Sequence, residues 1–267
     1  MASSAAVRAL EENAWSMWTM FGRGPGCRLI DTDEIMAYET PIARFPYNMV
    51  FRFRVGADAA DRRLDEVLAP YRQRGVPLAW LLHPTSRPDD LRDRLRARGL
   101  ALGEIVKGMA LDLDALPPVP PAPSGVDVFE GATGEIDDWM RLVSWRYDLS
   151  ADTAATLEGL YRLAIDDDPG RRTRWWGARR GNVPLSKAVL HTHDDVAGIY
   201  GVATVEDGRG LGLASLLTLE ALNVAKARGC TLAVLHATPM AVALYERLGF
   251  ESVCDFEVWA DPGHLHL

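Results

Sequence analysis

An apolar stretch, residues 196–205, leads directly into a turn rich in glycine, and helical spacing of apolar residues follows from Leu213. The turn reads Asp207-Gly208-Arg209-Gly210-Leu211-Gly212. Glycines let the backbone approach a ligand closely, and the first turn of a helix offers unpaired N–H groups at the positive end of its dipole. Together with the Arg209 side chain, this arrangement predicts an anion site suited to a pyrophosphate.

Two familiar phosphate-binding loops do not fit this turn. A dinucleotide-binding G-x-G-x-x-G pattern would need glycine at Leu213. A Walker A loop would need Gly-Lys-Ser/Thr at its end, and the sequence has no such run.

Residues from about 125 to 260 resemble the GCN5-related N-acetyltransferase (GNAT) superfamily. The family turn, Gln/Arg-x-x-Gly-x-Gly/Ala, falls on Asp207 to Gly212, with Asp207 at the position usually held by Gln or Arg. That change weakens the expected phosphate contact without removing it. A second family pattern, a small residue, three others, Tyr, and a closing Gly-Phe, falls on Ala241, Tyr245 and Gly249-Phe250.

The resemblance implies a fold, a donor and a reaction. The fold is α/β (α+β), a GNAT-like mixed, mostly antiparallel sheet flanked by helices. The donor is acetyl-coenzyme A (acetyl-CoA), a cosubstrate with its pyrophosphate on the turn and its pantetheine along the preceding strand, and no metal is expected. The reaction is N-acetylation of a small-molecule amine by direct attack on the thioester. The implied donor-binding residues are Val202, Ala203, Thr204, Asp207, Gly208, Arg209, Gly210, Leu211, Gly212, Leu213, Ala214 and Thr238.

Two residues are candidates for catalysis. The resemblance places Tyr245 where a phenol would protonate the leaving thiolate, which lowers the cost of its developing charge. The alternative for Tyr245 is a helix tyrosine packed on the sheet. His236 ends a predicted strand, and a neutral imidazole suits a general base, although it also suits a hydrogen-bonding residue at a strand end. We interpret Thr238 mainly as a helix N-cap, with Pro239 at N1. A contact of Thr238 with coenzyme A is the secondary interpretation.

A proline-rich segment divides the chain. Five prolines fall within the seven residues 117–123, and such a run favours an extended spacer over a helix or a central strand. We therefore predict a first domain over 1–116, a linker over 117–124 and a catalytic GNAT domain over 125–267.

Both predicted domains have an alternating order of strands and helices. In the second, strands are expected at 127–130, 174–178, 185–191, 196–205, 231–236 and 250–259, and helices at 135–146, 151–166, 213–228 and 238–248. In the first, strands are expected at 48–55 and 77–83, and helices at 58–74 and 88–98. Val55 to Gly99 has the same length as Val205 to Gly249, which indicates a weak internal duplication. The alternative is that any β-α-β-α unit has similar lengths. Since 55–58 has no glycine-rich turn, the first half is expected to be a degenerate copy.

The composition of the chain limits the kinds of partner and the cellular location that are expected for it. The 37 acidic and 29 basic residues give a net charge of −8, which opposes contact with a phosphate backbone and argues against nucleic acid. No apolar run approaches the roughly 20 residues that span a bilayer, and Glu11 and Glu12 argue against a signal peptide. The three cysteines have no metal-ligand spacing and fit a reducing cytoplasm. The expectation is a cytoplasmic monomer or homodimer.

Two alternative functions stay open at this level. Asp207 in place of a basic residue is compatible with a non-catalytic acyl-CoA-binding regulatory module. The same fold is also compatible with an acyltransferase whose acyl donor is bound to a carrier protein. The sequence does not identify the acceptor.

Overall fold

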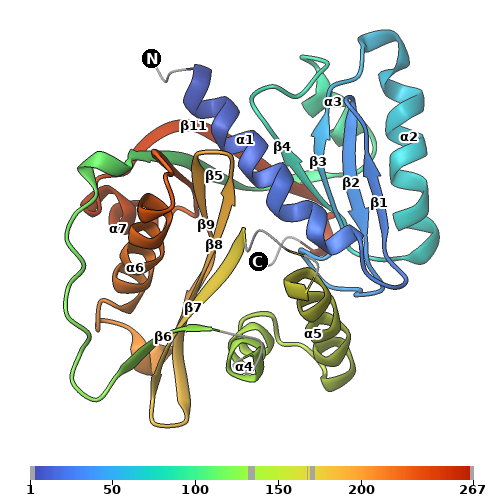
Figure 1. Cartoon of the computed structure of the whole chain (residues 1–267). Helices are drawn as coiled ribbons and strands as arrows, with labels where there is room; N and C mark the ends of the chain where they lie inside the picture. Colours follow the sequence, from blue (N-terminus) through green and yellow to red (C-terminus); the bar gives the residue numbers. More distant parts are fainter. Residues whose placement is uncertain (1–3, 132–135, 167, 169–171, 265–267) are drawn as a thin grey trace. The chain divides into compact units, whose positions relative to one another are not determined.

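A computed structural model gives the arrangement of the chain (Figure 1). It describes residues 4–131, 136–166, 168 and 172–264. The chain forms two compact units, and each is built from two separate segments. The C unit comprises Met1–Met17 and Gly108–Val253, and the N unit comprises Trp18–Lys107 and Cys254–Leu267. The domain boundary at 117–124 stays a prediction.

The C unit contains a mixed sheet. Its strands are β6 (Asp127–Gly131), β7 (Thr173–Arg180), β8 (Val183–His193), β9 (Val196–Thr204) and β10 (Leu232–Ala237). They lie in the order β10-β9-β8-β7-β6, with β5 (Ala101–Asp112) beside β10. The pairs from β6 to β9 are antiparallel, and β9 with β10 is parallel.

Helices cover both faces of this sheet. They are α1 (Ser4–Trp18), α4 (Ile136–Tyr147), α5 (Ala151–Asp166), α6 (Leu213–Ala227) and α7 (Val242–Arg247). Alternate residues of a strand point to opposite faces. Ala188 and Leu190 of β8 pack in one hydrophobic cluster with α6, whereas Lys187 contacts Trp139 of α4. The helices α6 and α4 therefore lie on opposite faces of β8 (Figure 1).

The N-terminal helix α1 is part of the C unit. Asn13 Nδ2 donates to the carbonyl oxygens of His191 (3.2 Å) and Val196 (3.0 Å), and the Tyr200 hydroxyl donates to Asn13 Oδ1 (2.6 Å). A Cβ at Gly198 would lie 2.0 Å from Asn13 Oδ1, so α1 needs glycine there. These contacts attach the first residues of the chain to β8 and β9, a helix that the sequence did not predict.

His191 is a buried histidine between α1 and β7. Its Nε2 lies 2.9 Å from Ser16 Oγ, and its Nδ1 lies 2.8 Å from Thr173 Oγ1. Burial, and then the charges of Arg172 and His193, lower its pKa to about 3, against an opposing effect of Asp168. The ring is therefore neutral in the folded protein at pH 7.

This lowered pKa predicts a pH-dependent stability. The unfolded chain takes up a proton at His191 below about pH 6.5, whereas the folded chain does so only near pH 3, so folding stability falls as the pH drops through this window. At pH 5 the loss from this group is about 2 kcal/mol. We therefore compare the parent with His191→Gln by urea unfolding at pH 7 and at pH 5. The decrease in the free energy of unfolding from pH 7 to pH 5 should be about 2 kcal/mol smaller in His191→Gln than in the parent. An equal drop in both proteins would contradict the assignment.

The N unit repeats the order of the C unit. Its elements are β1 (Arg28–Asp31), β2 (Ile35–Glu39), β3 (Met49–Phe53), α2 (Ala57–Arg74), β4 (Ala79–Leu82) and α3 (Leu91–Ala97), with most of β11 (Glu251–Ala260). The strands β3 and β4 are parallel and are linked by α2, as β9 and β10 are parallel and are linked by α6. The predicted mixed, mostly antiparallel sheet with helices and two related halves is confirmed.

Each unit takes its last strand from the other half of the chain. The strand β11 follows α7, yet Glu257–Ala260 pair with β4 of the N unit. The strand β5 follows α3, yet its end continues beside β10 of the C unit, where Leu113 N donates to Thr231 O (2.9 Å). Each unit is therefore assembled from two segments that are far apart in the sequence.

Short 3₁₀ helices complete the described chain. They are η1 (Thr19–Gly22), η2 (Leu113–Ala115), η4 (Glu206–Gly208) and η5 (Pro262–His264). Among the helices that the structure describes, none combines the length and apolarity required to cross a membrane.

Candidate functional site

The parallel strands β9 and β10 diverge within the C unit. They pair from Val196 with Leu232 to Ile199 with Leu235, and no pair follows although both strands continue. Two residues after the last pair, Gly201 has φ +55°, and the register of β9 on β8 shifts. Two residues, Gly201 and Val202, oppose the single residue Ala188, which defines a β-bulge. The edge from Val202 to Thr204 is thus left without a strand partner on its β10 side.

The glycine-rich turn stands at the end of this free edge. Gly210 and Gly212 have φ of +72° and +73°, and a Cβ at either position would meet nothing within 4 Å. Gly212 is the N-cap of α6, and the first intrahelical bond at this end runs from Leu216 N to Gly212 O (3.0 Å). The N–H groups of Leu213 and Ala214 precede it and have no acceptor in the helix. The open backbone and these donors fit an anionic group.

Gly208 has a different role from the other two glycines. It is buried, and a Cβ there would lie 3.0 Å from Leu185 O and 3.0 Å from Thr204 Cγ2. Its missing side chain lets the turn pack against β8. Asp207 and Arg209 are exposed beside it, and Arg209 makes no ion pair with any residue that the structure describes. Its guanidinium is available to an anion.

The strand residues before the turn are held from β8. Ser186 Oγ donates to Ala203 O (3.1 Å) and lies 2.8 Å from Thr204 Oγ1. Val202 and Leu211 pack against the same hydrophobic cluster that contains Leu213. The structure therefore brings the predicted strand edge, the turn and the start of α6 together.

Tyr245 belongs to this cluster as well. Its ring packs edge-on against Phe250, with centroids 5.8 Å apart. Burial raises the pKa of its phenol to about 12. The hydroxyl makes no hydrogen bond with any residue that the structure describes. Tyr245 is thus a packed ring with a protonated hydroxyl that has no described protein partner.

His236 lies one residue beyond the last pair of β9 and β10. Its Nε2 atom is buried, and burial lowers the pKa of the imidazole to about 4. The ring is neutral at physiological pH. It stands at the point where the two strands separate.

The prediction that Thr238 caps a helix with Pro239 at N1 is wrong. The segment 239–241 is a turn, and Ala241 N donates to the Thr238 carbonyl (2.8 Å). The helix α7 begins at Val242 with Ala241 as its N-cap, and it ends before Gly249, whose φ is +94°. Proline fixes φ for a β-turn as well as for N1, so the local pattern did not separate the two.

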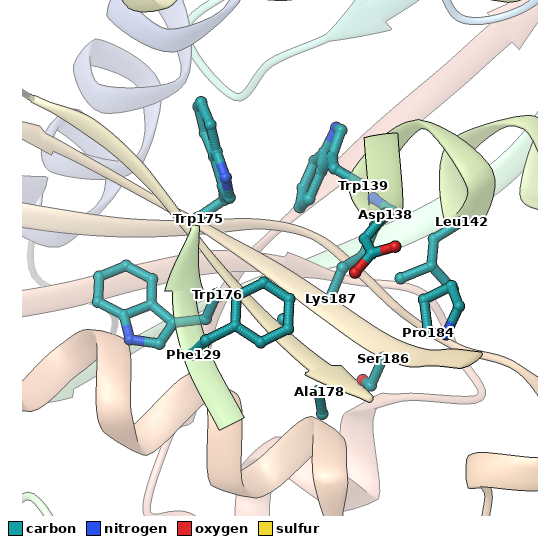
Figure 2. Close-up of a pocket in the computed structure, with 11 residues that line it drawn as sticks. Phe129, Asp138, Trp139, Leu142, Trp175, Trp176, Ala178, Pro184, Ser186 and Lys187 are labelled. Atoms are coloured by element: carbon teal, nitrogen blue, oxygen red, sulfur yellow. The ribbon is translucent and has the colours of Figure 1, made fainter. Parts of the chain in front are cut away.

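One residue of this region, Lys187, was not predicted from the sequence. Lys187 of β8 is 3% exposed, and its Nζ donates to Gly201 O (2.7 Å). The same Nζ lies 4.1 Å from the centroid of the Trp139 ring. The available signal was a lysine inside the apolar stretch 185–190. Figure 2 shows Lys187 with the residues of a small pocket between α4 and the strands β6, β7 and β8.

The N unit lacks an open edge at the equivalent place. Its parallel strands pair at Met49 with Ala79 and Val50 with Trp80, and a bridge between Arg54 and Arg87 then joins them again. Arg87 N donates to Phe53 O (2.9 Å). The residue before α2, Gly56, has φ −63°. A turn with left-handed glycines is therefore absent before α2.

No metal site accompanies these elements in the described part of the chain. Among those residues, no group of three or more His, Cys, Asp or Glu side chains is placed to hold a metal ion.

Comparison with known proteins agrees with this architecture. Residues 137–250 match the sequence model of the Acetyltransferase (GNAT) family. A comparison with curated proteins gave no match. Among solved structures, a GCN5-related N-acetyltransferase from Kribbella flavida has a TM-score of 0.67 and 21% identity, over 95% of this chain and 96% of that one.

Two further structures are similar over most of the chain. A tandem GNAT protein from the clavulanic acid biosynthesis pathway has a TM-score of 0.62 and 16% identity, over 92% of this chain and 86% of that one. A GCN5-related N-acetyltransferase from Sphaerobacter thermophilus has a TM-score of 0.58 and 17% identity, over 79% of this chain and 70% of that one. At these identities the likeness establishes the fold alone.

Proposed function

Because residues 137–250 form a domain of the GNAT acetyltransferase family, we propose that this protein is an N-acyltransferase that uses acetyl-CoA. The acetyl group passes to the amine of a small molecule by direct attack on the thioester. Acetyl-CoA supplies the activated acyl group. The acceptor is proposed to be small, since no feature of the sequence marks a peptide or nucleic-acid site.

The observation that carries the proposal is the combination of a free strand edge with a helix N-terminus. The edge Val202–Thr204 offers backbone N–H and C=O groups that an amide-containing pantetheine arm can pair with. The open turn at Gly210 and Gly212, with the first N–H groups of α6, suits the pyrophosphate. The Val202 N–H, in the bulge, is proposed to polarise the thioester carbonyl.

Tyr245 is proposed to stabilise the departing thiolate. With a pKa of about 12, its phenol is protonated at every physiological pH. A thiol has an ordinary pKa of about 8.5, so complete proton transfer from this phenol to a thiolate is unfavourable. The hydroxyl therefore acts chiefly by donating a hydrogen bond to the developing charge, and water can complete the protonation.

His236 is proposed as the proton acceptor near the attacking amine. A neutral imidazole has one ring nitrogen that can accept a proton. A pKa of about 4 means that it holds a proton only briefly. It is therefore suited to pass a proton on through water rather than to store it.

Calorimetry with acetyl-CoA, followed by release of the coenzyme A thiol in the presence of a panel of primary amines, tests the proposed function. Binding with amine-dependent thiol release is the expected result. Binding without release for any amine would favour a non-catalytic acyl-CoA-binding module, which Asp207 motivates. Saturation by free acetyl-CoA would argue against a carrier-protein donor, and failure to bind acetyl-CoA would overturn the proposal.

The closed N unit predicts the stoichiometry of binding. We expect one acetyl-CoA per full-length chain, because β3 and β4 are joined again by the Arg54–Arg87 bridge and the left-handed glycine turn is missing. Calorimetric titration measures this number directly. Two equivalents, or one equivalent that persists in a variant with a disrupted turn in the C unit, would contradict the degenerate-copy interpretation.

A further inference from the structure

Lys187 is a buried cation attached to the bulge of β9. Its side chain is 3% exposed, and its Nζ lies between the Gly201 carbonyl oxygen, at 2.7 Å, and the face of the Trp139 ring, at 4.1 Å. An ammonium group is costly to bury, and a charged hydrogen bond with an aromatic face offsets part of that cost. A hydrogen bond from a charged donor is stronger than a neutral one, so this contact holds the Gly201 carbonyl firmly.

The direction of this carbonyl determines the direction of one backbone donor. The C=O of Gly201 and the N–H of Val202 belong to the same peptide group, which is planar and trans, so they point in opposite directions. With the carbonyl directed at Lys187, the Val202 N–H points away from the side on which β8 and α4 lie. Gly201 and Val202 are the two bulge residues, and neither has a register partner in β8 or β10.

A purely structural role does not require a lysine here. Gly201 is an exposed residue, and water is a common partner of backbone carbonyls that have no donor from the protein. Even buried ion pairs can often be replaced by apolar side chains of similar volume without loss of stability, so the burial of Lys187 is weak evidence for a stabilising role. The bond from Lys187 does, however, polarise the peptide group, and a polarised peptide is a stronger donor at its N–H.

We propose that Lys187 is a positioning residue for acyl transfer, which fixes and polarises the Gly201–Val202 peptide so that the Val202 N–H is directed at the thioester carbonyl. The proposal rests on the proposed function, because it concerns the same bulge. Lys187 itself touches neither the donor nor the acceptor in this scheme. Its effect passes through one peptide group.

Three variants of the full-length protein test this role. Lys187→Met keeps the length of the side chain and removes the donor, and Lys187→Gln restores a neutral donor. Val189→Ala is the matched control, because Val189 is buried in the same strand and lies 3.8 Å from the Cβ position of Gly201, yet has no polar group. The probes are acetyl-CoA labelled with ¹³C at the thioester carbonyl, and hydroxylamine as the amine nucleophile.

The first readout is the infrared stretch of the labelled carbonyl in the bound state. In the parent, the carbonyl frequency of bound acetyl-CoA should be lower than that of acetyl-CoA in solution. The decrease should be smaller in Lys187→Gln and smallest in Lys187→Met.

The second readout is the rate of single-turnover acetyl transfer to hydroxylamine. Lys187→Met should be about tenfold slower or more, since deleting an oxyanion donor outright costs about 10²–10³-fold. Affinity for acetyl-CoA should stay within twofold, and Val189→Ala should match the parent in both readouts after correction for stability.

The outcomes distinguish a failure of the proposed acyl transfer from a failure of the positioning role of Lys187. If the parent does not bind acetyl-CoA, the proposed function fails. If the parent binds and reacts but Lys187→Met shows the same carbonyl shift and a rate within twofold, the positioning role is wrong. A loss in Lys187→Met that Val189→Ala reproduces in shift and rate would likewise overturn it, because packing would then explain the effect.

Discussion

The Gly210→Asp variant is expected to bind acetyl-CoA about 10³-fold more weakly than the parent and to keep its fold. A Cβ at this position meets nothing within 4 Å, and Asp tolerates the left-handed backbone, here φ +72°, better than most residues. Its carboxylate, however, would stand where the pyrophosphate is proposed to bind. Two like charges about 4 Å apart repel by about 4 kcal/mol at an effective dielectric constant of 20, which corresponds to this loss. Calorimetry measures the affinity, and circular dichroism reports the fold.

A glycine just beyond the other end of α6 provides the control for backbone strain. Gly229 follows the same helix at its other end, has φ +94° and also has open space at its Cβ. Gly229→Asp introduces the same side chain into the same kind of backbone, away from the turn. We expect its affinity for acetyl-CoA to equal that of the parent. Unchanged affinity in Gly210→Asp would remove the turn from the donor site, and an equal loss in both variants would attribute the effect to strain.

The Tyr245→Phe variant is expected to lose about 10²–10³-fold in the rate of acyl transfer, the usual cost of deleting a hydrogen-bond donor to a developing negative charge. Phenylalanine retains the ring that packs against Phe250, so the hydrophobic cluster stays filled. The loss should appear in single-turnover rates and not in the affinity for acetyl-CoA, because the hydroxyl is proposed to act only on the developing thiolate. The measurement requires that chemistry limits the rate and that the two proteins have matched stability.

Tyr71→Phe is the control for the loss of a buried hydroxyl. Tyr71 is 1% exposed in the N unit, and its hydroxyl donates to Tyr38 O (3.0 Å). Its removal should cost about 1 kcal/mol of stability and leave acyl transfer unchanged. A Tyr245→Phe rate within twofold of the parent would leave Tyr245 as a packing residue. A large loss accompanied by weaker binding would mean that the hydroxyl positions the donor.

Local signals in the sequence were sufficient to predict the glycine-rich turn before α6. The left-handed conformations of Gly210 and Gly212, the start of α6 at Leu213 and the left-handed Gly229 after it depend on residues within one or two turns of the chain. Backbone sterics act at this range, so the pattern alone predicts them. The same local signals failed at Thr238, where a turn and a helix start have the same preferred residues.

The tertiary structure decided which distant segments complete each unit. The helix α1 joins the C unit through Asn13 and Ser16, and β5 and β11 are exchanged between the two halves of the chain. An apolar strand satisfies its hydrogen bonds and its buried face equally well beside several partners. The choice among them depends on the packing of the whole sheet, which no local window contains.

The sequence by itself determined the order of strands and helices around the turn, the glycine conformations and the position of Tyr245 after β10. Only the tertiary structure placed Lys187 under the Gly201 carbonyl, set His236 at the divergence of β9 and β10, and closed the N unit through Arg54 and Arg87. The physical reason is the distance along the chain over which each effect acts. Conformational preferences are fixed by neighbours in sequence, whereas a buried charge, a lowered pKa or a rejoined pair of strands exists only when residues far apart in the chain exclude water together.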